Sequence, residues 1–237
     1  MWKRNHRGNS MISTGVNGTP DQGIWPKSAR VIRVKTFDQR GRWKLTAKAN
    51  SIGYVSNIYK VDDEYQSMFR AGTLCSSEIR KEINEGEHHR LIALLFDQRR
   101  RLATFTDREA TGNASPRQMQ SSIPDCVFDI LSALYFVRSR PLTVGQTIEL
   151  PVNDGARTVN LRVEVQAKEE IKTEIGTFPA TRVEPDLFSG NLFKSKGRIF
   201  VWFSDDASHL PLQMKAQIGI GTITATLAGI ERAEGTP

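Results

Sequence analysis

The stretch RIFVWFSDDASHLPLQMK, residues 198–215, places a short polar segment between two apolar runs. Residues 199–203, IFVWF, are apolar at every position, so both faces of this segment call for burial, as in a strand at the centre of a sheet. Pro211 has no amide proton to donate to a ladder, and it marks the beginning of the return strand. The stretch therefore predicts a β-hairpin deep in a sheet.

Asp205, Asp206 and His209 lie between the two arms of this hairpin. A metal site needs at least three converging ligands, and an acid/base pair needs carboxylates that face a common pocket. Neighbouring residues of a strand or turn usually point apart, and Asp and Ser side chains often bond their own backbone in turns. We favour the turn, and we keep a metal-dependent hydrolase built on these three residues as a further hypothesis.

Other short segments of the chain alternate between apolar and polar residues, the period of two that is typical of half-buried strands. Turn residues separate these segments. Asp154-Gly155 and Gly176-Thr177 indicate tight hairpin turns, and short connections favour antiparallel neighbours. Residues 108–122 are polar and predict a loop. The predicted strands lie at 29–37, 41–50, 63–70, 73–84, 88–98, 100–107, 146–152, 157–166, 169–175, 178–184, 197–204, 210–218 and 221–231.

One segment, 121–142, has the period of a helix instead. Ser122 and Asp125 resemble a capping box, Pro124 falls in the first turn, and Pro141 ends the helix. We expect a mostly β fold: a strongly curved antiparallel sheet, a half-barrel or open barrel, packed around one main helix near 123–138.

Composition divides the chain into three parts. Residues 1–28 are rich in Gly, Asn, Ser, Thr and Pro and predict disorder, residues 29–232 predict one β domain, and residues 233–237 predict a flexible tail. The first residues lack the apolar segment of a signal peptide, and we find no transmembrane segment. Read as written, this beginning predicts a cytoplasmic protein.

The formal net charge is +7, which permits anionic partners without proving them. The arginines at 99–101 and the basic run 194–198 could contact phosphates, but basic turns are usually solvated, so we regard nucleic-acid binding as disfavoured. The two cysteines, Cys75 and Cys126, fit no paired zinc motif, and spacing alone leaves open whether they form a bridge.

No nucleophile elbow or phosphate loop is present, so the sequence predicts no catalytic residue, no metal ligand and no cofactor. What stands out is a set of aromatic residues that would seek the concave side of the sheet, leaving either a filled core or an apolar groove. The candidate ligand-binding residues are Trp43, Tyr54, Tyr59, Phe69, Phe128, Tyr135, Phe200 and Trp202.

Four spaced motifs occur in order: GYVSNIYKVDDEYQSMF, DILSALYFVRSRPLTVGQ, EEIKTEIGTFPATRVEP and VWFSDDASHLPLQMK. Over residues 41–231 the chain thereby resembles the domain-of-unknown-function family 3108. The resemblance implies a β-rich bacterial protein that is exported to the periplasm, with no known activity to carry over. The hairpin also looks like that of the periplasmic lipoprotein carriers of the Lol type, a likeness of fold alone.

These observations lead to a first hypothesis, a non-enzymatic envelope protein that binds a lipid, acyl chain or lipoprotein segment in its concave sheet. The alternative is a structural or protein–protein interaction module of the envelope with a filled core.

Overall fold

The structure is a computed structural model that describes residues 10–15, 32–36, 41–50, 60–110, 115–155, 157–187, 197–218 and 221–232. Within these residues it contains fourteen strands and one helix, α1 (Ile130–Arg138). The strands are β1 (Ser10–Gly15), β2 (Ile32–Thr36), β3 (Arg42–Asn50), β4 (Asp62–Arg70), β5 (Ser76–Glu85), β6 (His88–Asp97), β7 (Leu102–Glu109), β8 (Arg117–Ser122), β9 (Thr147–Asn153), β10 (Thr158–Thr173), β11 (Gly176–Pro185), β12 (Gly197–Ser204), β13 (Pro211–Ile218) and β14 (Gly221–Arg232).

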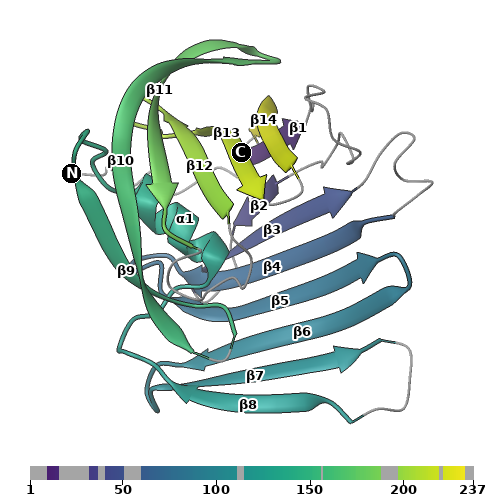
Figure 1. Ribbon diagram of the computed structural model, residues 1–237. Helices are drawn as coiled ribbons and strands as arrows, with labels where there is room; N and C mark the ends of the chain where they lie inside the picture. The colour runs from purple at the N-terminus through teal and green to yellow at the C-terminus, as the bar shows by residue number, and fades with distance from the viewer. Residues whose placement is uncertain are drawn as a thin grey trace, which may run out of the picture.

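The strands form two antiparallel sheets with α1 between them (Figure 1). One sheet follows the chain from β2 to β8, and the other has the order β1-β14-β13-β12-β11-β10-β9. Strands β1 and β2 lie side by side at the edges of the two sheets (Figure 1), but among the described residues no ladder joins them. The predicted open, curved antiparallel architecture is confirmed, although it is built from two sheets where we expected one.

The helix begins later than predicted. Its first residue is Ile130, and residues 123–128 are not helical because the sheets take their backbone groups. The Val127 carbonyl accepts a hydrogen bond from the Ser76 amide. The Phe128 amide donates to the Pro151 carbonyl and the Phe128 carbonyl accepts from the Asn153 amide, and both of these partners belong to β9. An amide or carbonyl held by a sheet neighbour cannot close a helical turn, so the predicted boundary near residue 123 is wrong.

Two strands occur where the sequence predicts none. Residues 117–122 form β8, which pairs with β7 from Asp107 opposite Arg117 to Leu102 opposite Ser122. Its polar sequence hides the strand because it is the edge of its sheet. Residues 10–15 form β1, which pairs with β14, and the other residues of the segment 1–28 lie outside the described residues. The tail 233–237 lies outside the described residues.

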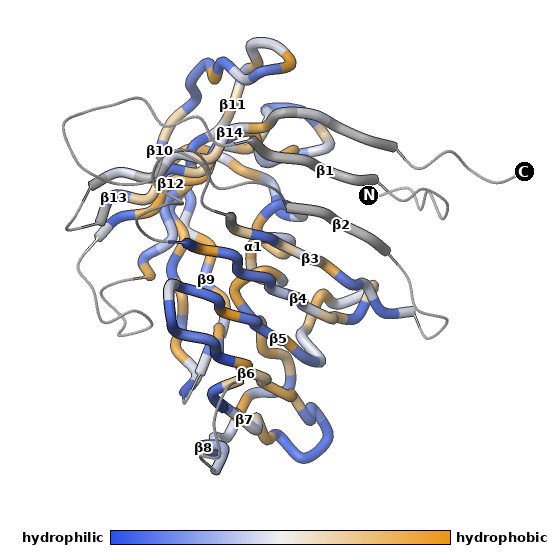
Figure 2. Tube along the Cα trace, turned by 90° about the vertical axis from the view of Figure 1, so that its right-hand side faces the viewer, coloured by the Kyte–Doolittle hydropathy of each residue, from blue (hydrophilic) through white to orange (hydrophobic). Residues whose placement is uncertain are grey.

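Strands β4 and β5 carry isolated hydrophobic positions among hydrophilic ones, as Figure 2 shows by colour. Phe69 on β4 and Ile79 on β5 are buried in the core. The helix α1 contributes Ala133 and Val137 to the cluster against β9–β12 and Tyr135 to the cluster against β3 and β4. Period-two patterning thus places the core between the sheets, on both sides of one helix.

Strand β12 is buried on both faces, as predicted. Val201 and Phe203 pack in the cluster that includes α1, whereas Phe200 and Trp202 pack in a second cluster on the opposite face. The two predicted strands at 157–166 and 169–175 are one continuous strand, β10, with a register shift between Val165 and Ala167. A bulge of this kind bends a strand and reverses its faces, which lets β10 serve both clusters.

Candidate functional site

The aromatic residues predicted to line one apolar groove belong to separate clusters. Trp43, Phe69 and Tyr135 pack together, with ring centroids 6.2 Å apart for Trp43 and Phe69 and 5.9 Å apart for Phe69 and Tyr135. Phe69 is fully buried, and burial raises the pKa of the Tyr135 hydroxyl. This cluster packs α1 against β3 and β4.

The remaining predicted aromatic residues lie elsewhere. Phe128 precedes α1, and its ring centroid lies 4.6 Å from that of Phe136. Phe200 and Trp202 face away from α1, beneath the bend of β10, where the Trp202 indole Nε1 donates a 2.8 Å hydrogen bond to Glu169. Tyr54 and Tyr59 lie outside the described residues. The six described residues therefore do not line a common groove.

A buried carboxylate fixes the beginning of α1. Asp129 is fully buried, and its Oδ1 accepts hydrogen bonds from the amides of Leu131 and Ser132 at 2.8 and 3.1 Å. Its Oδ2 accepts hydrogen bonds from the hydroxyls of Ser67 on β4 and Ser76 on β5, both at 2.6 Å. One side chain thus caps the helix and ties it to two strands.

The segment before α1 is also tied covalently. Cys75, just before β5, forms a disulfide with Cys126, across a Cα–Cα distance of 5.3 Å. The structure thereby resolves the alternative that the sequence left open. The bridge and the Asp129 network hold the same end of the helix against the first sheet.

The other end of α1 contacts the hairpin of residues 198–215. The Arg138 Nε donates to the Ser208 carbonyl at 2.9 Å, and the His209 Nδ1 lies 2.8 Å from the Arg138 carbonyl. His209 therefore binds the end of the helix. Its backbone φ of 41° is a turn conformation.

Asp205 and Asp206 have separate roles in the turn. Lys168 bonds Asp205 at 2.7 Å and holds the pKa of that carboxyl below its usual range. Partial burial would raise the pKa of Asp206, but hydrogen bonds from Ser208 and Ser204 outweigh it and lower that pKa. The prediction that these carboxylates form the turn is confirmed.

Replacing Asp206 with alanine is expected to lower the free energy of unfolding by about 1 kcal/mol, the usual worth of a turn hydrogen-bond set at the surface. Because the pKa of Asp206 is lowered in the fold, this contribution is present above its ordinary pKa and is lost as pH falls through the lowered value. Urea denaturation at pH 7 and pH 3 measures both effects.

In the same variant, metal content measured by plasma mass spectrometry should stay at background. Metal that is bound by the native protein and lost on replacing Asp205, Asp206 or His209 would favour the hydrolase hypothesis instead. Within the described ranges, no group of three His, Cys, Asp or Glu residues is arranged to hold a metal ion.

The described residues include no helix with the length and hydrophobicity of a membrane span.

The space between the sheets also contains an ion pair. The Lys81 ammonium on β5 lies 2.7 Å from Asp154 in the turn after β9, and both side chains are nearly buried. Burial raises the pKa of Asp154, and Lys81 opposes that shift. The pair joins the two sheets, and the buried Asp154 Oδ1 makes no hydrogen bond within the described residues.

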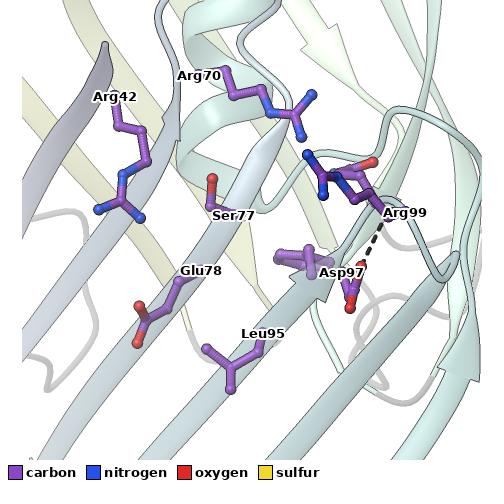
Figure 3. A pocket seen from close by; sticks show the side chains of 9 residues that line it. Arg42, Arg70, Ser77, Glu78, Leu95, Asp97 and Arg99 are labelled. Atoms are coloured by element: carbon purple, nitrogen blue, oxygen red, sulfur yellow. Dashed lines mark hydrogen bonds between the residues drawn. The ribbon is translucent and has the colours of Figure 1, made fainter. Parts of the chain in front are cut away.

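Sequence reasoning did not find a pocket on the outer face of the first sheet, with a volume of about 430 Å³. Arg42 on β3, Arg70 on β4 and Arg99 in the β6–β7 turn surround Ser77 there, as Figure 3 shows. The triplet 99–101 was the available signal, but only strand register brings the other two arginines to it.

The comparisons with known proteins agree with the fold. The sequence model described as "Protein of unknown function (DUF3108)" matches residues 27–228. A search of curated proteins found no match. A similar solved structure is the beta-barrel-like protein of domain of unknown function DUF1849 from Brucella abortus, with a TM-score of 0.58 and 7% identity over 95% of this chain and 98% of that chain.

The likeness to the Brucella abortus protein concerns the fold alone, since the identity is so low. The predicted likeness to lipoprotein carriers stays a prediction. The family match covers most of the chain, including the four spaced motifs between residues 41 and 228. The chain belongs to the DUF3108 family.

Proposed function

We propose that this protein is a non-enzymatic module of the bacterial envelope that acts by contact with another protein, while its own helix fills its interior. The observation that carries the proposal is the position of α1 between the sheets. Its residues Ala133, Tyr135 and Val137 are buried in two separate clusters. A cavity for an acyl chain would have to occupy the same space.

The attachment of α1 favours the filled core over an apolar ligand site. Opening the interior would break the Asp129 network at one end and the contacts of Arg138 and His209 at the other. Each buried polar group left without a partner costs about 1–3 kcal/mol. Lipid binding in the concavity is therefore the less favoured alternative.

The disulfide supports the envelope as the site of action. Cys75 and Cys126 are bridged, and structural disulfides persist in oxidising compartments such as the periplasm. The family resemblance points to the same compartment through its usually exported members. Fractionation of the native bacterium, followed by thiol labelling of the released protein, tests this part: reactive thiols on a cytoplasmic protein would oppose it.

Native mass spectrometry of protein purified from the envelope tests whether the core is filled. We expect the protein without stoichiometric lipid, and no rise in fluorescence when an anilinonaphthalene dye is added. The matched measurement uses the protein after reduction of the disulfide, where α1 is less firmly held. A lipid released in equal molar amount from the oxidised protein would favour the apolar-ligand hypothesis.

Photo-crosslinking in the native bacterium tests the protein contact. Leu95, Val144, Ile175 and Met214 are large apolar side chains with substantial exposure, and each is a suitable position for the photoreactive residue. We expect at least one to give a discrete crosslinked species, identified by mass spectrometry, that the same residue placed at exposed Arg117 does not give. Absence of such a species at all four positions would contradict the proposal.

A further inference from the structure

We infer that β8, an edge strand of the first sheet, binds the β8 strand of a second copy of this chain, antiparallel and in a register centred on Met119. The pairing joins the first sheets of the two copies into one continuous sheet. It uses an edge of the molecule and leaves the interior filled by α1 unchanged, so the inference goes beyond the proposed function.

Three of the four sheet edges in the described residues are covered or interrupted. Strands β1 and β2 lie side by side, so each lies close to the edge of the other. The edge of β9 includes Pro151, which has no amide proton, and Phe128 forms two hydrogen bonds along it. By contrast, Gln118 and Gln120 are exposed on β8, which ends the sheet in Figure 1. An edge without cover is a template for another strand.

The hydrogen bonds of β8 show which of its backbone groups face the open edge. The Ile123 amide donates to the Arg101 carbonyl at 3.0 Å, so the odd-numbered residues of the strand direct their amides and carbonyls to β7. The even-numbered residues therefore direct theirs outward. Ser122 agrees with this alternation, because its carbonyl accepts a 3.5 Å hydrogen bond from the Thr158 hydroxyl, which lies outside the ladder with β7.

A second β8 strand matches these outward groups when Met119 lies opposite Met119 of the second copy. Gln118 of each copy then lies opposite Gln120 of the other, and their outward amides and carbonyls form four hydrogen bonds. The glutamine side chains both donate and accept hydrogen bonds, so they can also pair across the junction. Arg117 lies opposite Ser121, which avoids the repulsion of like charges in a cross-strand pair.

The ends of the strand match one another in the same register. Pro116 has no amide proton, and it lies opposite Ser122 of the second copy, whose carbonyl already accepts a hydrogen bond from Thr158. The missing donor thus meets the occupied acceptor. Most unrelated strands would place an amide there without a free acceptor, which favours a second copy of this chain over a segment of another protein.

Single cysteine variants test the register under mild oxidation. In M119C the two new thiols lie in a non-hydrogen-bonded pair, about 4.5 Å apart at Cα, which suits a disulfide. In the matched controls Q118C and Q120C, each cysteine lies diagonally about 7–8 Å from its own copy, too far for a bridge. We expect at least about tenfold more covalent dimer in M119C than in either control on a non-reducing gel. Equal dimer in all three variants, or none in M119C, would overturn the inference.

Replacing Gln120 with proline tests the hydrogen bonds without a thiol. The Gln120 amide points outward, so proline leaves the ladder with β7 intact. Because both copies lose a bond, we expect the dissociation constant of the dimer to rise at least about tenfold in Q120P and less than about twofold in Q120A, which keeps the amide. Two short strands bury less than a standard interface, so sedimentation equilibrium should extend to about 500 µM.

A native chain that stays monomeric over this range, or a folded Q120P that dimerises like the native chain, contradicts the pairing. If Q120P does not fold, the cysteine variants decide. In the bacterium, a photoreactive residue at Arg117 should give a species of twice the mass of the chain. A crosslink from Arg117 to a different protein instead would overturn the assignment to a second copy.

Discussion

Replacing both Cys75 and Cys126 with alanine is expected to lower the free energy of unfolding by about 4 kcal/mol. The two cysteines are 51 residues apart, and a cross-link over a loop of that length removes much of the freedom of the unfolded chain. Alanine is chosen because Cys75 is buried and serine would place an unpaired hydroxyl there. Urea denaturation monitored by circular dichroism measures the difference.

The native protein with a reductant provides the control. Reduction of the disulfide should destabilise the native chain by nearly the same amount, and the same reductant should leave the double alanine variant unchanged. A loss below 1 kcal/mol in both experiments would show that the bridge constrains little. An unchanged native protein would show that the bridge is not formed in solution.

Replacing Asp129 with alanine is expected to lower the free energy of unfolding by about 3 kcal/mol. The change removes the acceptor for the amides of Leu131 and Ser132, which begin α1. It also leaves the Ser67 hydroxyl without its acceptor in the core and takes the charged acceptor from the Ser76 hydroxyl, for which only the Ser132 hydroxyl remains as an acceptor. Loss of an N-cap alone costs about 1 kcal/mol, so the buried serine hydroxyls supply the larger part. Thermal and urea denaturation measure the change.

Two variants separate these contributions. Asp129→Asn keeps an acceptor for the helix amides but loses the charge that strengthens the serine hydrogen bonds, so we expect a loss between those of the alanine variant and the native protein. Ser132→Ala removes the side chain that returns to the Asp129 amide and should cost about 1 kcal/mol. Equal losses for alanine and asparagine would assign the whole effect to the charge.

The strands were predictable because burial on one face leaves a period of two in the sequence, and burial on both faces leaves a continuous apolar run. The hairpin 198–215 is the clearest case, since Pro211 and the apolar run before it fixed both arms and β12 was found at the centre of its sheet. The polar strand β8 was missed because an edge strand exposes most of its residues, so pairing with β7 forms it without an apolar pattern. An apolar period in the sequence identifies the residues that are buried, whereas an edge strand can pair with its neighbour without any such period.

The helix boundary, the disulfide and the pocket lined by Arg42, Arg70 and Arg99 depend on contacts between distant residues. Asp129 and Ser132 offer a local cap signal, but only the hydrogen bonds of Val127 and Phe128 to the sheets show that the helix does not begin before Asp129, and the apolar spacing therefore extended it too far. The pocket needs the register that places Arg42 opposite Arg70, residues on separate strands. None of these contacts leaves a period in the sequence.

The order of elements along the chain has a consequence for biogenesis. Every strand of the β2–β8 sheet and both cysteines precede β9, and each strand of that sheet pairs with its immediate neighbour in the chain. Domains fold from the N-terminus as a chain is delivered, and neighbouring strands need only short loops to close. The first sheet and the Cys75–Cys126 disulfide can therefore form before the strands β9 to β14 are complete. Those later strands would then pack against a sheet to which the beginning of α1 is already attached.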